Sequence, residues 1–267
     1  MIGPEESPIV RGSRESALAH GLSHRMLSSA ELGVAYPFMR FGPRDVALQE
    51  DAGGVLFPED ALLSFQEAAR RSGAELRFGV KAEIGEHAAR CTVVTAGAWL
   101  PDLLPGLPMK GERQVLHWFD PVSDGDRIPL FIRDTEGPPL YVIPGFHGEG
   151  TKAAFHHGGE TSHPDRLLRD VSAEEVALMR RRLEATIPAL NGPLRRSAVC
   201  LYTNTPDEHF AIGFLPGRPD VLAVSPCSGH GFKFAPVIGE IVADLVAEGG
   251  TRHPLGLFDL ARFFRGG

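Results

Sequence analysis

The sequence predicts a mixed fold, α/β plus α+β, in two domains that are each assembled from separate segments of the chain. Two observations support this. Helical patterns alternate with buried-strand patterns at residues 55–105 and again after residue 200, whereas evenly spaced strand patterns divided by Pro and Gly turns fill the stretch between them. We therefore expect one domain from residues 55–105 and 201–267, and a second, antiparallel-sheet domain from residues 1–54 and 106–200.

Capping residues mark the expected helices. Ser13 can cap a short helix that ends at His20, with Gly21 as its stop, and residues 29–32 can begin another helical turn. Three longer helices are expected at residues 59–71 after Pro58, residues 172–186 from a capping box, and residues 236–248 before two glycines. In the first of these, apolar residues recur on one face: Leu62, Phe65, Ala68 and Ala69.

Strands are expected where short apolar or β-branched runs lie between turn residues. After the opening residues Met1 and Ile2, which read as the end of a strand, these runs are residues 46–50, 74–78, 92–97, 114–119, 130–132, 140–143, 152–155, 211–214 and 221–224.

Composition excludes several classes of protein. The formal charge of −7 argues against a nucleic-acid binder, and no apolar run approaches the roughly 20 residues of a membrane span. Three widely spaced cysteines do not form a disulfide framework, so a reducing, cytoplasmic location is expected. The N-terminus lacks the order of a basic and then an apolar region that a signal peptide shows.

Two stretches carry the strongest chemical signal, residues 197–209 and residues 228–234. The first contains Cys200 within an apolar run. In the second, Gly229 and Gly231 flank a histidine and precede Lys233 at the start of a helix. Glycines let backbone N–H groups approach a flat or anionic ligand, and a helix N-terminus favours negative charge. A bound cofactor is therefore expected here.

These residues resemble a known family. The matching stretches, in the family's order, are Gly53–Pro58, Val94–Trp99, Tyr141, Lys152, Val199–Tyr202, Thr205–Asp207 and Ser228–Phe234. They are similar to the monomeric sarcosine oxidase and N-methyltryptophan oxidase family of D-amino acid oxidase-like flavoproteins. The resemblance implies a partial FAD-binding, glutathione-reductase-like domain together with a substrate domain built on an antiparallel sheet.

The resemblance also implies an activity. Such an enzyme oxidises the C–N bond of an N-methyl or similar small amino acid through FAD, with oxygen as acceptor and hydrogen peroxide as product. Sarcosine, N-methyltryptophan, pipecolate and proline-like amines all stay open as substrates. A flavin dehydrogenase that does not use oxygen also stays open, as does a truncated, catalytically inactive remnant that acts as a binding or partner-dependent module.

Roles follow by position from the same resemblance. Cys200 would link covalently to the flavin, Lys152 would promote the reaction with oxygen, and Lys233 would help to hold the substrate carboxylate. The remaining residues would line the substrate pocket (Tyr141, His156 and Tyr202) or, together with Lys233, contact the flavin (Gly97, Trp99, Gly229, His230 and Gly231). A fixed ammonium stabilises the anion that forms as oxygen is reduced, and positive charge favours a thiolate.

The chain departs from the family pattern at two points. No Gly-x-Gly-x-x-Gly motif occurs in the 267 residues, and residues 145–150 contain glycines at the wrong spacing between two strand patterns. We therefore expect the N-terminal dinucleotide-binding βαβ unit to be lacking, and flavin binding to be weakened by its loss. Residues 79–90 form only a brief polar connection where the family has a small strand meander.

Each signal also has a purely structural interpretation. Cys200 could be a buried small hydrophobe, as is expected of Cys91 and Cys227, and Lys152 could be an ordinary exposed lysine. The stem of Lys233 could simply cover apolar surface, and Tyr141 and Tyr202 could be core aromatics. The spacing of His147, His156, His157 and His163 fits no familiar zinc pattern, so no metal is expected.

Overall fold

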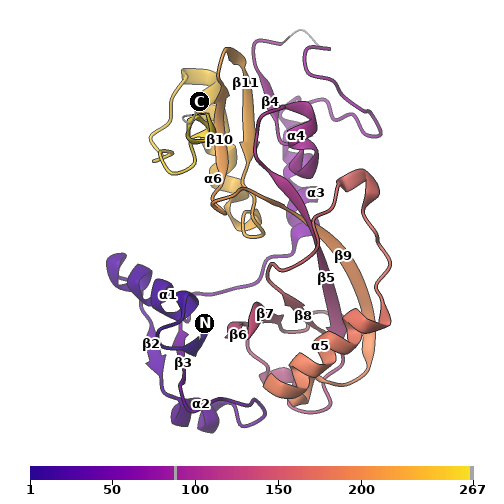
Figure 1. Ribbon diagram of the computed structural model, residues 1–267. Helices are drawn as coiled ribbons and strands as arrows, with labels where there is room; N and C mark the ends of the chain where they lie inside the picture. Colours follow the sequence, from indigo (N-terminus) through magenta and orange to yellow (C-terminus); the bar gives the residue numbers. More distant parts are fainter. Residues whose placement is uncertain (87–88, 265–267) are drawn as a thin grey trace. The chain divides into compact units, whose positions relative to one another are not determined.

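The computed structural model describes residues 1–86 and 89–264, and within them the chain forms two compact units (Figure 1). Unit 1 comprises residues 1–55, 113–160 and 168–200, and unit 2 comprises residues 56–112, 161–167 and 201–267. Residues 106–112 and 161–167, expected in the antiparallel-sheet domain, cluster with unit 2, and residue 55 clusters with unit 1. The division falls inside two long strands, and no turn signal marks that point.

Unit 1 holds most of an eight-stranded sheet with the order β2-β3-β1-β6-β7-β8-β5-β9. Its strands are β1 (Ile2–Pro4), β2 (Arg25–Leu27), β3 (Asp45–Gln49), β5 (Lys110–Phe119), β6 (Phe131–Thr135), β7 (Gly137–Ile143), β8 (Thr151–Phe155) and β9 (Leu194–Asn204). The antiparallel pairing expected from β5 to β8 is present in β6–β7, β7–β8 and β5–β8. Because β1 pairs with β6 in parallel, the whole sheet is mixed.

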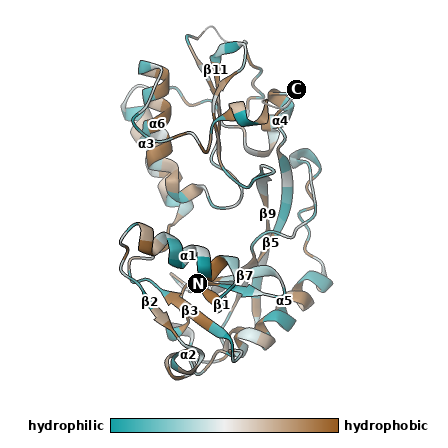
Figure 2. Ribbon diagram, turned by 60° about the vertical axis from the view of Figure 1, so that its left-hand side comes forward, coloured by the Kyte–Doolittle hydropathy of each residue, from teal (hydrophilic) through white to brown (hydrophobic). Residues whose placement is uncertain are grey.

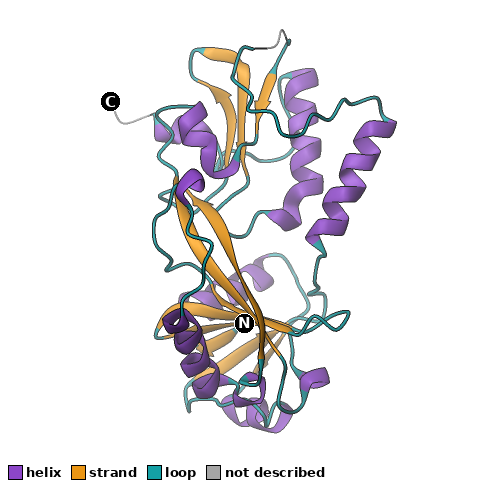
Figure 3. Cartoon of the chain, turned by 90° about the vertical axis from the view of Figure 1, so that its right-hand side faces the viewer, coloured by secondary structure: helices purple, strands orange, loops and turns teal. Residues whose placement is uncertain are grey.

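The sheet of unit 1 has one face buried by a helix. Leu140, Val142, Ala153 and Phe119 alternate onto this face and are fully buried. They share a core with Met179 and other residues of α5 (Ala173–Thr186), and Figure 3 shows this part of the chain as strands with helices packed around them. Strand alternation places Trp118, Tyr141 and Lys152 on the opposite face, which we call the open face.

Unit 2 is built on a three-stranded sheet with the order β10-β11-β4. Its strands are β4 (Thr92–Val94), β10 (Ala211–Leu215) and β11 (Arg218–Ser225), and its helices are α3 (Pro58–Arg71), α4 (Leu100–Leu103) and α6 (Ala235–Glu248). β10 and β11 are antiparallel, whereas β11 and β4 are parallel. Two apolar clusters form its core; one involves α4 and β4, and the other involves α6.

Capping decides where the helices begin. The helix expected after Ser13 is α1 (Pro8–Ala19), which begins earlier because Ser7 accepts a hydrogen bond from the Val10 N–H at 3.3 Å. The second short helix is α2 (Ser29–Ala35), capped by Ser28. The capping box of α5 is present as expected, with Ser172 and Glu175 bonded reciprocally. No helix in the described ranges is long and apolar enough to cross a membrane.

One sequence expectation for unit 2 is wrong, and one helix face is left uncovered. Residues 74–78 form no strand, because no described strand pairs with them. The apolar face expected on α3 exists but is not covered: α3 has no buried residue, and Leu62 and Phe65 are 52% and 47% exposed. Figure 2 shows apolar and polar residues mixed along this helix. The periodicity identified the helix correctly, but it did not identify what the helix packs against.

Candidate active site

A cavity of about 600 Å³ lies in unit 2 where β4 and β11 end. Its wall includes Gly97 after β4, Tyr202 from β9, and the loop Gly229–Gly231 that leads into α6. The carboxyl ends of neighbouring parallel strands, followed by a helix N-terminus, are a common place for a nucleotide cofactor. Five of the residues expected to serve a flavin or substrate therefore line one cavity: Gly97, Tyr202, Gly229, His230 and Gly231.

The loop before α6 needs its glycines. Gly229 has a φ of +75°, and a Cβ added there would meet the Tyr202 ring at 2.4 Å. A Cβ at Gly231 would meet the Pro226 carbonyl oxygen at 1.7 Å. Buried Ser228, with a φ of +59°, ties the loop down because its N–H donates to the Thr203 carbonyl at 2.8 Å. The loop is thus held rigidly against β9.

His230 is oriented by its own loop and by a neighbouring ring. Its Nδ1 lies 2.8 Å from the Ser228 carbonyl oxygen, and its ring stacks on Phe210 with centroids 4.9 Å apart. A carbonyl only accepts, so Nδ1 carries a proton and donates. The same loop holds Lys233, whose Nζ donates to the His230 carbonyl at 3.1 Å.

Trp99 and Lys233 are not among the residues that line the cavity. The Trp99 indole N–H donates to Asp165 Oδ1 at 2.8 Å, and Trp99 is 48% exposed. Cys227, expected to be structural, does line the cavity, as do Thr95 and Thr203, which the sequence analysis did not single out. Thr95 lies inside the matching stretch Val94–Trp99, and Cys227 and Thr203 lie directly beside matching stretches.

The cavity fits part of an FAD molecule. Its volume is within the usual range for small-molecule sites, and its wall combines apolar side chains such as Val224, Ile238 and Val242 with the backbone of the glycine loop. A flat ring system requires both an apolar surface and a few backbone polar groups. Gly97 has a φ of +54°, and a Cβ added there would meet only the Thr203 hydroxyl oxygen, at 4.0 Å, so the chain can approach such a ligand closely.

The second group of expected residues lies on the open face of the unit 1 sheet. Trp118 pairs with Lys152 across β5 and β8, and Tyr141 pairs with Ala154 across β7 and β8, so these side chains project from the same face. The Lys152 Nζ lies 5.6 Å from the Trp118 ring centroid and 5.5 Å from the Tyr141 ring centroid. By strand alternation His156, directly after β8, falls on this face as well.

Cys200 belongs to the same face as Lys152. On β9, Ser197 turns toward the buried face, where its hydroxyl lies 2.8 Å from His117 Nδ1. Arg196 turns the other way, and its guanidinium carbon lies 3.6 Å from the Trp118 ring centroid. Alternation along β9 therefore brings Cys200 to the face of Trp118 and Lys152. Its thiol is unpaired and half-buried, and Leu201, Tyr202 and Thr203 of the cavity wall follow it directly in sequence.

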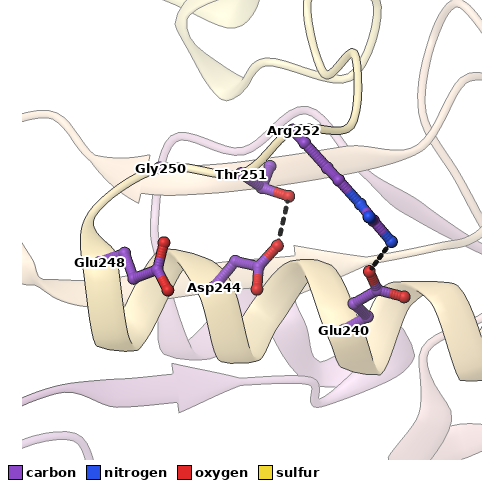
Figure 4. A pocket seen from close by; sticks show the side chains of 6 residues that line it. All are labelled: Glu240, Asp244, Glu248, Gly250, Thr251 and Arg252. Carbon is purple, nitrogen blue, oxygen red and sulfur yellow. Dashed lines mark hydrogen bonds and ion pairs between the residues drawn. The ribbon is translucent and has the colours of Figure 1, made fainter.

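A separate hollow of about 610 Å³ in unit 2 has the wrong chemistry for a flavin (Figure 4). Glu240, Asp244 and Glu248 follow one another along one side of α6. Arg252 pairs with Glu240 at 2.7 Å, and the Thr251 hydroxyl donates to Asp244 at 2.8 Å. Among the described residues no group of three or more His, Cys, Asp or Glu side chains could hold a metal ion.

Comparison with known proteins gives a family match over most of the chain. A family model described as FAD dependent oxidoreductase (DAO) matches residues 4–245. Monomeric sarcosine oxidase of Streptomyces avermitilis is 39% identical over 288 aligned positions, which cover 98% of this chain and 75% of that protein. N-methyl-L-tryptophan oxidase of Salmonella arizonae is 33% identical, with the same coverage of 98% and 75%. The 288 positions exceed this chain's length, so the first relative carries residues that this chain lacks.

Solved structures share the fold at lower identity. L-proline dehydrogenase from P. horikoshii superposes with a TM-score of 0.83 at 23% identity and covers 98% of this chain and 75% of that one. NikD, an amino acid oxidase essential for nikkomycin biosynthesis, superposes with a TM-score of 0.76 at 18% identity, covering 93% and 71%.

Proposed function

This chain belongs to the DAO family of FAD-dependent oxidoreductases, and from this premise we propose that it oxidises the C–N bond of an N-methyl or similarly small amino acid. Oxygen is the proposed acceptor, and hydrogen peroxide the proposed product. The substrate loses two electrons and two protons, and oxygen takes up both. The resulting imine reacts with water, and for an N-methyl amine this gives formaldehyde and the free amine.

The observation that carries this proposal is the open face of the unit 1 sheet, where the Lys152 ammonium lies between two aromatic rings and Cys200 lies on the same side. When bound, FAD supplies the acceptor for the two electrons that leave the C–N bond. Lys152 supplies a fixed positive charge where negative charge develops on oxygen. A half-buried ammonium acts more strongly there than one fully in water, because less solvent screens it.

We propose that Cys200 forms the covalent link to the flavin. Its position on β9 supports this role, because the next three residues line the cavity that fits the cofactor. Gly97, Gly229, His230 and Gly231 are the proposed backbone and ring contacts of the flavin.

The substrate would be held by side chains that carry a hydroxyl, an imidazole or an ammonium. Tyr141 and His156 are proposed pocket walls from the face of unit 1, and Tyr202 from β9. Lys233 is the proposed partner of the substrate carboxylate, because an ammonium is a natural point charge for such a group. All three cysteines are unpaired, which supports a reducing, cytoplasmic setting.

The proposal is tested by separating the two half-reactions. The protein, purified with added FAD, is mixed without oxygen with sarcosine, N-methyltryptophan or proline, and loss of flavin absorbance is followed. Oxygen is then admitted, and peroxide is measured with a peroxidase. We expect Lys152→Met to slow reoxidation about 100-fold while flavin reduction stays close to that of the unaltered protein. Lys110→Met, which removes an exposed lysine of β5, serves as the control.

Two results would contradict the proposal. Flavin reduction by an amine without any peroxide on admission of oxygen would indicate a dehydrogenase. Equal slowing of both half-reactions in Lys152→Met would remove that lysine from its assigned role.

A further inference from the structure

We infer that Trp118 is the positioning residue for the Lys152 ammonium, and that Arg196 in turn fixes the Trp118 ring. This rests on the proposed function, because it concerns how the proposed oxygen-activating charge is kept in place. Neither Trp118 nor Arg196 was singled out by the sequence. Their importance follows from the pairing of strands that are far apart in the chain.

Strand register brings Trp118 to Lys152. The two residues pair directly across β5 and β8, and the Nζ atom lies 5.6 Å from the indole ring centroid. The same Nζ atom lies 5.5 Å from the centroid of the Tyr141 ring. A lysine side chain has several rotatable bonds and so many rotamers to choose from. Two rings within about 6 Å attract the cation and restrict it.

The indole ring is itself held from β9. The Arg196 guanidinium carbon lies 3.6 Å from the ring centroid, which is the distance of a stacked contact. Arg196 Nη2 also lies 3.3 Å from Glu149 Oε2 in the turn between β7 and β8. The neighbouring Arg195 donates to the Gly148 carbonyl in the same turn. The guanidinium therefore covers one face of the ring, and the ring cannot tilt toward that side without displacing it.

Position matters for this charge because electrostatic stabilisation falls as the distance to the developing anion grows. Removing the Trp118 ring leaves the charge of Lys152 intact but widens the range of positions that it samples. We expect the reoxidation rate to fall about tenfold in this variant, because it loses roughly one cation–π contact. This effect is smaller than the one expected when Lys152→Met removes the charge itself. Flavin reduction, which does not use this charge, is expected to change less than about twofold.

The arrangement can be measured without flavin turnover. The chain has four lysines, Lys81, Lys110, Lys152 and Lys233, so ¹³C reductive methylation gives few signals. The Lys152 signal is the one that Lys152→Arg removes. We expect ring currents to shift it upfield of the Lys81 and Lys110 signals. Trp118→Leu should move it back toward them, and Trp118→Phe should keep most of the shift.

Arg196→Met provides an independent variant if Trp118→Leu does not fold. It frees the indole ring without removing it, so the Lys152 signal should move in the same direction by a smaller amount. Glu149→Gln removes only an exposed ion pair and should leave the signal in place. A Lys152 signal that stays unchanged in both Trp118→Leu and Arg196→Met would overturn the inference.

Kinetics separate this inference from the proposed function. Reoxidation should slow in Trp118→Leu and be largely restored in Trp118→Phe, which a general loss of stability would not produce. Slow reoxidation in Lys152→Met together with normal reoxidation in Trp118→Leu would overturn the positioning role alone. Normal reoxidation in Lys152→Met would remove that lysine from its assigned role, and flavin reduction by an amine without any peroxide would overturn the proposed function itself.

Discussion

Cys200 and Cys227 are the two thiols whose positions bear on how a flavin could be attached. Cys200 is half-buried on the open face of the unit 1 sheet, whereas Cys227 is 8% exposed and lines the cavity of unit 2. A thioether requires a thiol that can reach the ring and ionise. The two thiols differ in exposure and in position, so they make a matched pair for a test of attachment.

We expect yellow colour to stay with the protein pellet after acid precipitation of the unaltered chain. In Cys200→Ser the flavin should appear in the supernatant, because only non-covalent contacts remain to hold it. Cys227→Ser should behave like the unaltered protein. Retention of colour in Cys200→Ser and its release in Cys227→Ser would reassign the link to Cys227.

His117 is a buried histidine of the unit 1 sheet whose role is structural. It is 2% exposed between β5 and β9, with Ser197 as its hydrogen-bond partner. Burial lowers the pKa of His117 to about 4; Glu175 opposes this shift and Arg180 adds to it. The folded protein therefore keeps this imidazole neutral at a pH where the unfolded chain, with an ordinary pKa of about 6.5, binds a proton.

Because of His117, the free energy of unfolding should decrease as the pH is lowered. Its contribution is fully present above the unfolded pKa of about 6.5 and decreases as the pH drops toward about 4, because only the unfolded state takes up the proton. Between pH 7 and pH 4.5 we expect the free energy of unfolding to fall by about 2–3 kcal/mol more than in His117→Gln. Urea denaturation of both proteins at the two pH values measures this. Identical pH dependence in the two would show that His117 titrates normally.

At the level of elements, substitution of two glycines of α6 is expected to change stability in opposite directions. Gly239 lies in the helix interior, and nothing lies within 4 Å of the position that its Cβ would occupy. Gly249 ends the helix with a φ of +76°, which an L-residue with a side chain adopts only with strain.

We expect Gly239→Ala to raise the free energy of unfolding by about 0.5–1 kcal/mol, because alanine loses less backbone entropy in a helix. Gly249→Ala should lower it by about 1 kcal/mol. Chemical denaturation of the two variants side by side gives the comparison. The same sign of change in both would contradict this account of the helix end.

The elements were predicted best where the signal is local. Ser172 and Glu175 mark the start of α5, and Pro58 marks the start of α3, because caps and proline act within one turn. The strand expected at residues 74–78 failed because a strand needs a partner, which a local pattern cannot supply. Trp118 and Arg196 were missed for the same reason, since they meet only through the order β8-β5-β9.

For the whole chain, motif-level resemblance predicted the family, and the family match over residues 4–245 confirmed it. Residues expected to contact a flavin line one cavity in unit 2 because they lie at strand ends and in a glycine loop, positions that a motif records directly. The sequence could not show which apolar faces would be covered. α3 has the expected periodicity, yet its apolar residues are exposed.

This exposed face predicts how the whole molecule behaves in solution. Leu62, Leu63 and Phe65 are 52%, 63% and 47% exposed on neighbouring positions of α3, and exposed apolar groups of this kind favour association. The formal charge of −7 opposes association at neutral pH, and this repulsion disappears near the sequence pI of about 5.9. We therefore expect self-association to increase as the pH is lowered from 8 toward 6, measured by sedimentation velocity at several protein concentrations.

Replacing the exposed apolar residues should suppress that association without loss of stability. In Leu62→Glu with Phe65→Glu the association at pH 6 should fall at least severalfold. The free energy of unfolding should change by less than about 1 kcal/mol, because neither side chain is buried. Leu18→Glu with Val34→Glu, which alters two exposed residues of unit 1 at 64% and 83% exposure, is the matched control. If the control pair suppresses association equally, added negative charge explains the effect, and the face of α3 has no special part in it.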